Sequence, residues 1–242
     1  MDLANRVVKL APSSVLETAT GSGVVPRALA PRLAAGVRYV ATDLNQPMLD
    51  HASSDHPAAN PIEWLQADAL SLPFEDSSFD IVICQFGVMF FPDRVAGYHE
   101  ALRVLKPGGS FIFNVWDHIR ENEFSELATE AARQIFPDDP PLFLARTPHG
   151  HHDADRVRDE LTRSGFKDIS FDVRAEVSHA PSPRHPAIAY CQGTPLRNEI
   201  EQRDAGQLQA VTDLAESLIS QKFGSGTVEG KIQALVFTAR PD

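Results

Sequence analysis

The chain has 242 residues, 43% of them hydrophobic, and a formal net charge of −11. This length can bury one α/β core with an appended cap, and the negative charge argues against a nucleic-acid or anionic-membrane partner, because both require a basic surface. Two cysteines cannot form a disulfide framework and no apolar run reaches the roughly 18 residues of a membrane span, so we expect a cytoplasmic protein without membrane insertion.

The first elements surround a glycine-rich turn. Residues 1–12 carry apolar residues at helical spacing and predict a short helix. The apolar residues 15–16 then end in the acid Glu17, and residues 19–23, ATGSG, follow before helix-forming residues resume. This pattern predicts a strand, a tight turn and a helix. Because glycine and alanine leave the turn nearly without side chains, a nucleoside cofactor can lie against backbone amides at the helix N-terminus.

The spacing within this turn decides between two cofactor classes. A dinucleotide turn, G-x-G-x-x-G, would need its last glycine at the position of Pro26. The order from Glu17 to Gly23 is instead acid-x-Ala-x-Gly-x-Gly. It resembles motif I of the class I methyltransferases that depend on S-adenosylmethionine (SAM). An ordinary turn between a strand and a helix is the alternative interpretation.

Two acids follow the next predicted strands. Residues 24–34 have helical composition, and residues 37–41 form a second β-rich run that leads to Asp43, twenty residues after Gly23. An acid at this strand tip is placed to accept ribose hydroxyls, although it could instead cap the helix that begins near Pro47. Residues 62–67 predict a third strand, and Asp68 follows it either as a ligand-binding acid or as a loop cap.

Residues 79–84 form a continuous apolar run, which is typical of a central parallel strand. Ligands in open α/β sheets bind beyond the carboxyl ends of strands, so we expect residues 85–90, which begin at Gln85, to border the cofactor and the transferred group. The aromatic residues here form either the wall of the pocket or a selective cage. The segment lacks the Asn/Asp-Pro-Pro-Tyr signature, which argues against exocyclic amines as acceptors.

The remaining elements complete a doubly wound sheet. A helix at 93–105 and the turn Lys-Pro-Gly-Gly at 106–109 lead to a fifth strand at 110–116. Further strands are expected at 166–173 and 231–239, with helices at 121–136, 153–164, 187–191, 196–203 and 208–223. We therefore expect one α/β domain, residues 1–242. It would hold a Rossmann-like, seven-stranded, doubly wound sheet with an antiparallel last strand and helical cap insertions at about 118–150 and 176–229. The apolar positions of 208–223 make the second insertion a helical cap or a homodimer surface.

Motif I, the two aspartates, the fourth strand tip and the Pro-Gly-Gly turn occur together in an order that resembles the class I SAM-dependent methyltransferases. The resemblance covers residues 3–113 and is best with the ubiquinone and menaquinone C-methyltransferases and their small-molecule relatives. It implies SAM as cofactor. It also implies that Asp68 and the backbone amide of Ala69 recognise adenine, while Glu17 and the turn amides hold the amino and carboxylate groups. The expected cofactor-binding residues are Glu17, Ala19, Gly21, Ser22, Gly23, Asp43, Leu44, Met48, Asp68, Ala69, Gln85, Phe86 and Gly87.

Methyl transfer is an in-line displacement that needs no covalent residue and depends on orientation and the exclusion of water. A general base is needed only if the acceptor loses a proton during attack. Candidates are Asp117 and His118, and in the insertions His149, His151, His152 and His179. The composition favours an ordinary surface loop residue over a base for each histidine. The cluster at 149–152, HGHH, has no carboxylate at a familiar ligand spacing, so no metal is expected. The acceptor and its reacting atom stay open.

Two other functions compete with a methyltransferase. A nicotinamide oxidoreductase is disfavoured by Pro26 and Asp68. A catalytically inactive SAM-binding module is the second alternative. Members of the family usually carry a longer leader that folds over the cofactor, whereas about a dozen residues precede the first strand here, so the pocket is expected to be more open.

Overall fold

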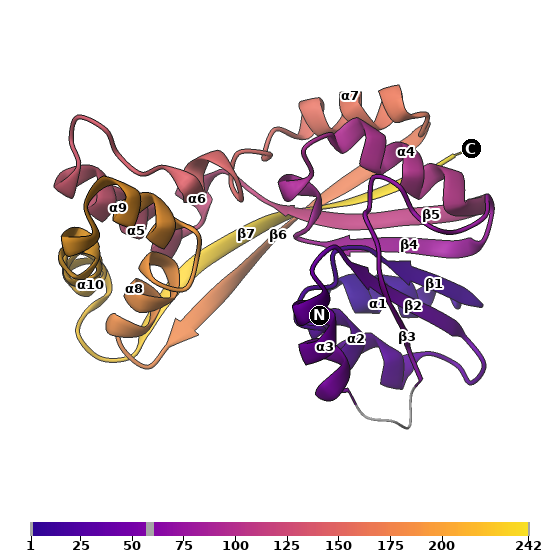
Figure 1. Ribbon diagram of the computed structural model, residues 1–242, viewed down its shortest axis with the longest axis horizontal. Helices are drawn as coiled ribbons and strands as arrows, with labels where there is room; N and C mark the ends of the chain where they lie inside the picture. The colour runs from indigo at the N-terminus through magenta and orange to yellow at the C-terminus, as the bar shows by residue number, and fades with distance from the viewer. Residues whose placement is uncertain (1, 57–60, 242) are drawn as a thin grey trace. The chain divides into compact units, whose positions relative to one another are not determined.

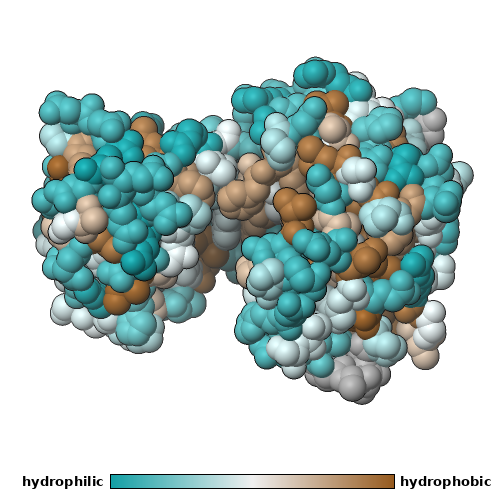
Figure 2. Space-filling view, viewed as in Figure 1, coloured by the Kyte–Doolittle hydropathy of each residue, from teal (hydrophilic) through white to brown (hydrophobic). Residues whose placement is uncertain are grey.

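The computed structural model describes residues 2–56 and 61–241, which form two compact units. The first unit comprises Met1–Val115, Asp153–Asp172 and Leu235–Asp242, and the second comprises Trp116–His152 and Val173–Ala234. The two insertions predicted from the sequence fall largely inside the second unit. Figure 2 shows that hydrophilic residues cover most of the visible face of each unit.

The strands of the described chain form one seven-stranded sheet in the order β3-β2-β1-β4-β5-β7-β6 (Figure 1). The pairs β3–β2, β2–β1, β1–β4 and β4–β5 are parallel, and the predicted α/β fold with an antiparallel last strand is confirmed. Sequence order reverses between β1 and β4, which is where ligands bind in such sheets. The strands are β1 (Ser14–Glu17), β2 (Arg38–Asp43), β3 (Glu63–Gln66), β4 (Phe79–Gln85), β5 (Leu105–Trp116), β6 (Asp168–Ala180) and β7 (Val228–Arg240).

The helices of the first unit cover the sheet. Their bounds follow the caps in the sequence: Asp93 accepts a hydrogen bond from the amide of Ala96 at the start of α4, and Gly165 ends α7 in a left-handed conformation. The second helix, predicted at 24–34, ends at Leu29, and a 3₁₀ turn that contains Pro31, η1 (Ala30–Arg32), follows it. The helices are α1 (Asp2–Lys9), α2 (Val24–Leu29), α3 (Gln46–Ser54), α4 (Arg94–Val104) and α7 (Ala154–Ser164).

The second unit is a helical cluster with its own apolar core. Val211, Ala215 and Ile219 of α10 are buried, and α10 packs on α5 and α8. The apolar face that the sequence assigned to a cap or a dimer surface is therefore largely buried within this unit. Its helices are α5 (Glu123–Ile135), α6 (Phe143–Arg146), α8 (Arg184–Cys191), α9 (Leu196–Asp204) and α10 (Leu208–Phe223), with 3₁₀ turns η3 (Ile119–Glu121) and η4 (Ala205–Gln207). Among the described helices, none combines the length and apolar character needed to cross a membrane.

Three strands, β5, β6 and β7, differ most from the sequence prediction. The turn expected at 106–109 lies inside β5, which begins at Leu105 opposite Phe79, and a register shift in β4 between Phe79 and Ile81 accommodates it. Lys106 stabilises this irregular pairing through an ion pair of 2.8 Å with Asp80 of β4. The last two strands are also longer than predicted. Apolar residues continue at every second position of β6 as far as Val177, beyond the predicted end at 173, and the exposed strand runs to Ala180.

Candidate functional site

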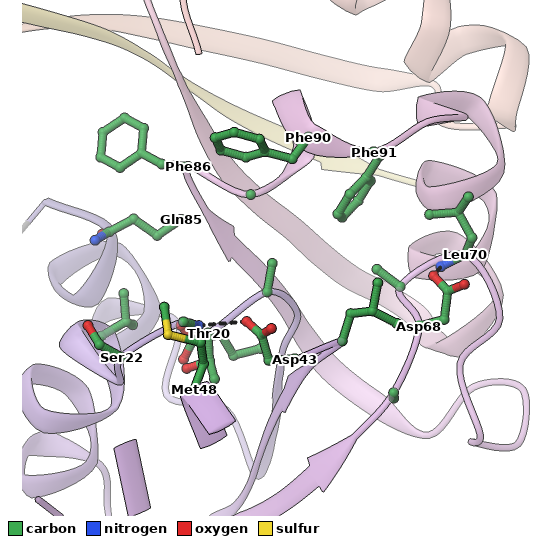
Figure 3. A pocket seen from close by; sticks show the side chains of 18 of the residues that line it. Thr20, Ser22, Asp43, Met48, Asp68, Leu70, Gln85, Phe86, Phe90 and Phe91 are labelled. Atoms are coloured by element: carbon green, nitrogen blue, oxygen red, sulfur yellow. Dashed lines mark hydrogen bonds between the residues drawn. The ribbon is translucent and has the colours of Figure 1, made fainter. Parts of the chain in front are cut away.

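A cavity of about 520 Å³ opens in the first unit at the carboxyl ends of β1, β2 and β4 (Figure 3). It lies at the reversal of strand order, as expected for this sheet type. All but one of the residues predicted to bind the cofactor line it; Gly23 is not among the described lining residues. The predicted residues that do are Glu17, Ala19, Gly21, Ser22, Asp43, Leu44, Met48, Asp68, Ala69, Gln85, Phe86 and Gly87. Further lining residues are Thr20, Val24, Val25, Ala67, Leu70, Phe90, Phe91 and Pro92.

The turn after β1 has a left-handed backbone at three positions, with φ values of +52° at Ala19, +57° at Gly21 and +77° at Gly23. The two glycines serve different purposes. A Cβ at Gly21 would have no described atom within 4 Å, so this position leaves open space at the cavity wall. A Cβ at Gly23 would lie 2.9 Å from the Cβ of Ala52, so Gly23 lets α2 begin close against α3.

The tip of β4 packs directly on this turn. A Cβ at Gly87 would lie 2.6 Å from both the Cβ of Ala19 and the Sγ of Cys84. The backbone of Phe86 has a left-handed conformation, with φ of +54°. Its amide donates to two oxygens of Asn114, the backbone carbonyl at 3.2 Å and the side-chain Oδ1 at 3.0 Å. Asn114 was not predicted; the signal was a single buried amide in the otherwise apolar second half of β5.

Asp43 connects the tip of β2 to the glycine turn. Its Oδ2 accepts from the amide of Gly21 at 2.8 Å (Figure 3), and its Oδ1 accepts from the amide of Asn45 at 2.9 Å. The residue that caps α3 is Asn45, so the alternative role of Asp43 as that cap is wrong. A carboxylate has about four acceptor positions, so both oxygens can still accept from a ligand.

Asp68 fits both interpretations given from the sequence. Its Oδ1 accepts from the amide of Leu70 at 2.9 Å, so Asp68 caps the loop, and Asp68 also lines the cavity. The loop that follows is held by α4: the guanidinium of Arg103 donates to the carbonyls of Leu72 (2.9 Å) and Phe74 (2.7 Å). Glu100 accepts from the amide of Leu72 at 2.7 Å. These anchors, which the sequence did not reveal, fix the cavity wall beside Asp68.

Glu17 is buried, with 1% of its surface exposed, where the end of β1 meets β2. The hydroxyl of Tyr39 donates to its carboxylate, and the Thr42 hydroxyl donates to its backbone carbonyl at 2.9 Å. Burial raises the pKa of Glu17 to about 8, although the hydrogen bond from Tyr39 opposes the shift. The carboxyl group therefore carries a proton over much of the neutral range, and a cation placed beside it would favour the ionised form.

Three of the base candidates come together in the second unit. The carboxylate of Asp117 accepts from the Gln233 side chain at 2.7 Å, and its carbonyl lies 2.9 Å from Nδ1 of His149. Nδ1 of His118 accepts from the amide of Arg120 at 3.2 Å. Burial lowers the pKa of His149, so this imidazole is neutral at pH 7, and an Nδ1 that donates to a carbonyl leaves the Nε2 lone pair available. None of the three candidates is among the described residues that line the cavity.

The histidine cluster at 149–152 does not form a metal site in the described structure. Within residues 2–56 and 61–241, no three His, Cys, Asp or Glu side chains are grouped so that they could hold a metal ion. Nδ1 of His152 instead lies 2.7 Å from the carbonyl of His149, and the ring of His118 contacts the ring of His152 edge-on at 4.6 Å. Each ring is thus positioned by backbone or by another ring.

We predict that Gly87→Ala lowers the free energy of unfolding by about 2 kcal/mol or more, because the new methyl group would overlap Ala19 and Cys84. The matched variant is Gly21→Ala, whose methyl group meets open space and whose cost is limited to about 1 kcal/mol of backbone strain. Urea unfolding of both variants measures the difference. Equal stability of the two would contradict the close packing of the strand tips.

We also predict that Glu17 makes folding sensitive to pH. Its pKa is about 8 in the fold against an ordinary value of 4.5, so the folded state binds the proton more tightly. The stabilisation is complete below 4.5 and is lost as pH rises towards 8. Between about pH 5 and about pH 8 the wild type should lose on the order of 3 kcal/mol more unfolding free energy than Glu17→Gln, which stays neutral. Identical pH profiles in urea unfolding would refute this role.

Comparisons with known proteins identify the family of the chain. A family model described as a methyltransferase domain matches residues 16–113. The demethylmenaquinone methyltransferase of Lactobacillus johnsonii is 31% identical over 166 residues, which cover 64% of this chain and 68% of that protein. The same enzyme of Clavibacter sepedonicus is 38% identical over 44% of this chain and 42% of its own length. The ubiquinone/menaquinone C-methyltransferase of Rickettsia prowazekii is 34% identical over 52% of this chain and 53% of its own length. The chain thus spans about two fifths to two thirds of these relatives.

Solved structures show the same fold. The YcgJ protein of Bacillus subtilis superposes with a TM-score of 0.63 over 100% of this chain and 99% of its own, at 18% identity. Phosphoethanolamine N-methyltransferase 2 of Haemonchus contortus, solved with SAM, superposes with a TM-score of 0.52 over 95% of this chain and 49% of its own, at 19% identity. The chain therefore belongs to the class I SAM-dependent methyltransferases of the ubiquinone/menaquinone C-methyltransferase group.

Proposed function

We propose that this enzyme methylates a small apolar acceptor with an aromatic ring, of the kind found in a demethylated quinol, with SAM held in the cavity of the first unit. The observation that carries the proposal is the convergence of the glycine turn, Asp43, Asp68 and the phenylalanine-bearing tip of β4 on one cavity. When bound, SAM supplies an electrophilic methyl group on a sulfonium.

The polar half of the cavity suits the cofactor. Asp43 would accept from the ribose hydroxyls, and Asp68 with the amide of Ala69 would bind the adenine edge. The amides of the turn would meet the carboxylate at the N-terminus of α2, and Glu17 would favour the ammonium group nearby. The open space beside Gly21 and the carboxylate acceptors of the cavity both fit such a cation-bearing nucleoside.

The apolar half of the cavity suits an aromatic acceptor. Phe86, Phe90 and Phe91 follow β4 along one side in Figure 3. Phe90 and Leu44 expose 54% and 67% of their surfaces, and large exposed apolar side chains at a cavity mark an apolar ligand. The relatives named demethylmenaquinone methyltransferase support a quinol-like ring. The phenylalanines would then be contact residues as well as wall.

The remaining roles follow from the same proposal. Transfer to a ring carbon releases a proton, so Asp117, His118 and His149 stay the candidate bases, with His149 favoured because it is neutral and oriented by a carbonyl. The partner would be a small molecule rather than a nucleic acid, in keeping with the net charge of −11. A cytoplasmic location and a homodimer formed through the helical insertion remain predictions.

Removing either aspartate should weaken the binding of S-adenosylhomocysteine. We expect Asp43→Ala and Asp68→Ala each to cost about 1–3 kcal/mol of binding free energy through a lost hydrogen bond, measured by isothermal titration. Asp55→Ala, which removes an exposed carboxylate outside the lining set, is the matched control and should bind like the wild type. Unchanged affinity in both test variants, with the fold intact, would rule out this site.

The acceptor class can be tested with labelled SAM and a panel that contains a demethylated naphthoquinol and a hydrophilic amine. We expect label in the quinol only. Phe90→Ala should lower kcat/KM for the quinol about tenfold, through lost apolar contact, while leaving S-adenosylhomocysteine binding unchanged. Label in the amine would refute the acceptor class. Cofactor binding without transfer to any acceptor would favour an inactive binding module.

A further inference from the structure

The outer edge of β6 is exposed along its middle. Among the described strands β6 is last in the sheet order, so it has a strand neighbour on one side only (Figure 1). Every residue from 172 to 177 is exposed, and Val173 and Val177 expose 52% and 50% of their surfaces. A strand edge of this length is a template for pairing with another strand, and large apolar side chains on it favour such pairing.

The sequence of this edge is complementary to itself. Residues 173–177 read Val-Arg-Ala-Glu-Val, with a valine at each end and opposite charges around Ala175. When two copies pair antiparallel about a two-fold axis at Ala175, Val173 of one lies opposite Val177 of the other. Arg174 likewise lies opposite Glu176, twice. Directly opposed side chains are the stabilising unit of an antiparallel pair, so both faces of the strand contribute.

Neighbouring registers lack this complementarity. An axis at Arg174 or at Glu176 would place two like charges directly opposite each other, which is destabilising. An axis between residues 174 and 175 would place Val173 opposite Glu176, and an axis between residues 175 and 176 would place Arg174 opposite Val177. Either one puts apolar and charged residues opposite each other on the same face. The pattern therefore specifies one register.

We propose that two copies of this chain associate through the outer edges of β6, antiparallel and two-fold about Ala175. This is an isologous contact of the kind that closes a dimer. It uses a different surface from the helical insertion, where the apolar side of α10 is already packed against the core of its own unit. No described residue of 173–177 lines the cavity, so association should not require the cofactor. The contact is one strand wide, which implies a weak dimer.

A cysteine placed on the axis tests the register. Opposed Cα atoms in an antiparallel pair lie about 4.5–5.5 Å apart, within the range of a disulfide. Ala175→Cys should therefore form a cross-linked dimer on mild oxidation. Val173→Cys is the control, because its two copies would be about 14 Å apart along the strands, and it should stay uncross-linked. Cys84 and Cys191 are buried and give little background. Failure of Ala175→Cys to cross-link, or equal cross-linking of both variants, would overturn the proposal.

Charge reversal tests the interface in solution. Arg174→Glu and Glu176→Arg each replace two attractive pairs with two repulsive ones and should raise the dimer dissociation constant about tenfold or more in sedimentation velocity. The double variant R174E/E176R restores opposite charges and should restore association. S-adenosylhomocysteine binding checks that each variant is folded. A wild type that stays monomeric at all concentrations, or a dimer insensitive to both single reversals, would overturn the proposal.

Discussion

The cavity depends on the close contact between the turn after β1 and the tip of β4. This contact is possible only because Gly87 has no side chain at the point where the chain meets Ala19 and Cys84. Ala19 and Phe86, on the two sides of the contact, both have left-handed backbones, a conformation that costs a non-glycine residue on the order of 1 kcal/mol or more. Parallel pairing of β1 with β4 and the two acceptors of Asn114 hold them there. The strain lies beside the ligand space rather than in the core.

Burying the side chain of Glu17 beside this contact costs free energy of folding, and a cationic ligand would offset that cost. Glu17 has no cationic partner in the described structure, and its burial favours the protonated form, held by the Tyr39 hydroxyl. A hydrophobic residue would stabilise this junction of β1 and β2 without that cost. An ammonium group near Glu17 would stabilise the ionised form, because the buried carboxylate would then have a charged partner. This cost is the reason we propose that Glu17 serves cofactor binding.

The sequence predicted the site residues that come directly after strands, because the order of the strands fixes their positions. The glycine turn, Asp43 and Asp68 come after apolar strands, and parallel strands bring their carboxyl ends to one edge. Tyr39, Asn114 and Arg103 were missed because each acts on a segment more than twenty residues away, and no local pattern marks such contacts. The start of β5 and the end of β6 were misplaced for other reasons: β5 begins in an irregular pairing that includes the Lys-Pro-Gly-Gly segment, and the prediction ended β6 at 173 although its apolar alternation continues to Val177.

The same reasoning explains why the cofactor is easier to infer than the acceptor. The family model covers residues 16–113, which include every described residue that lines the cavity. The second unit, with Asp117, His118 and His149, lies outside that segment. SAM imposes the same ribose, adenine and ammonium on every member, so the residues that bind it recur at fixed places. Acceptors differ, and the segments that would select them are free to differ as well. The acceptor must therefore be inferred from the chemistry of individual side chains, here the three phenylalanines that line the cavity.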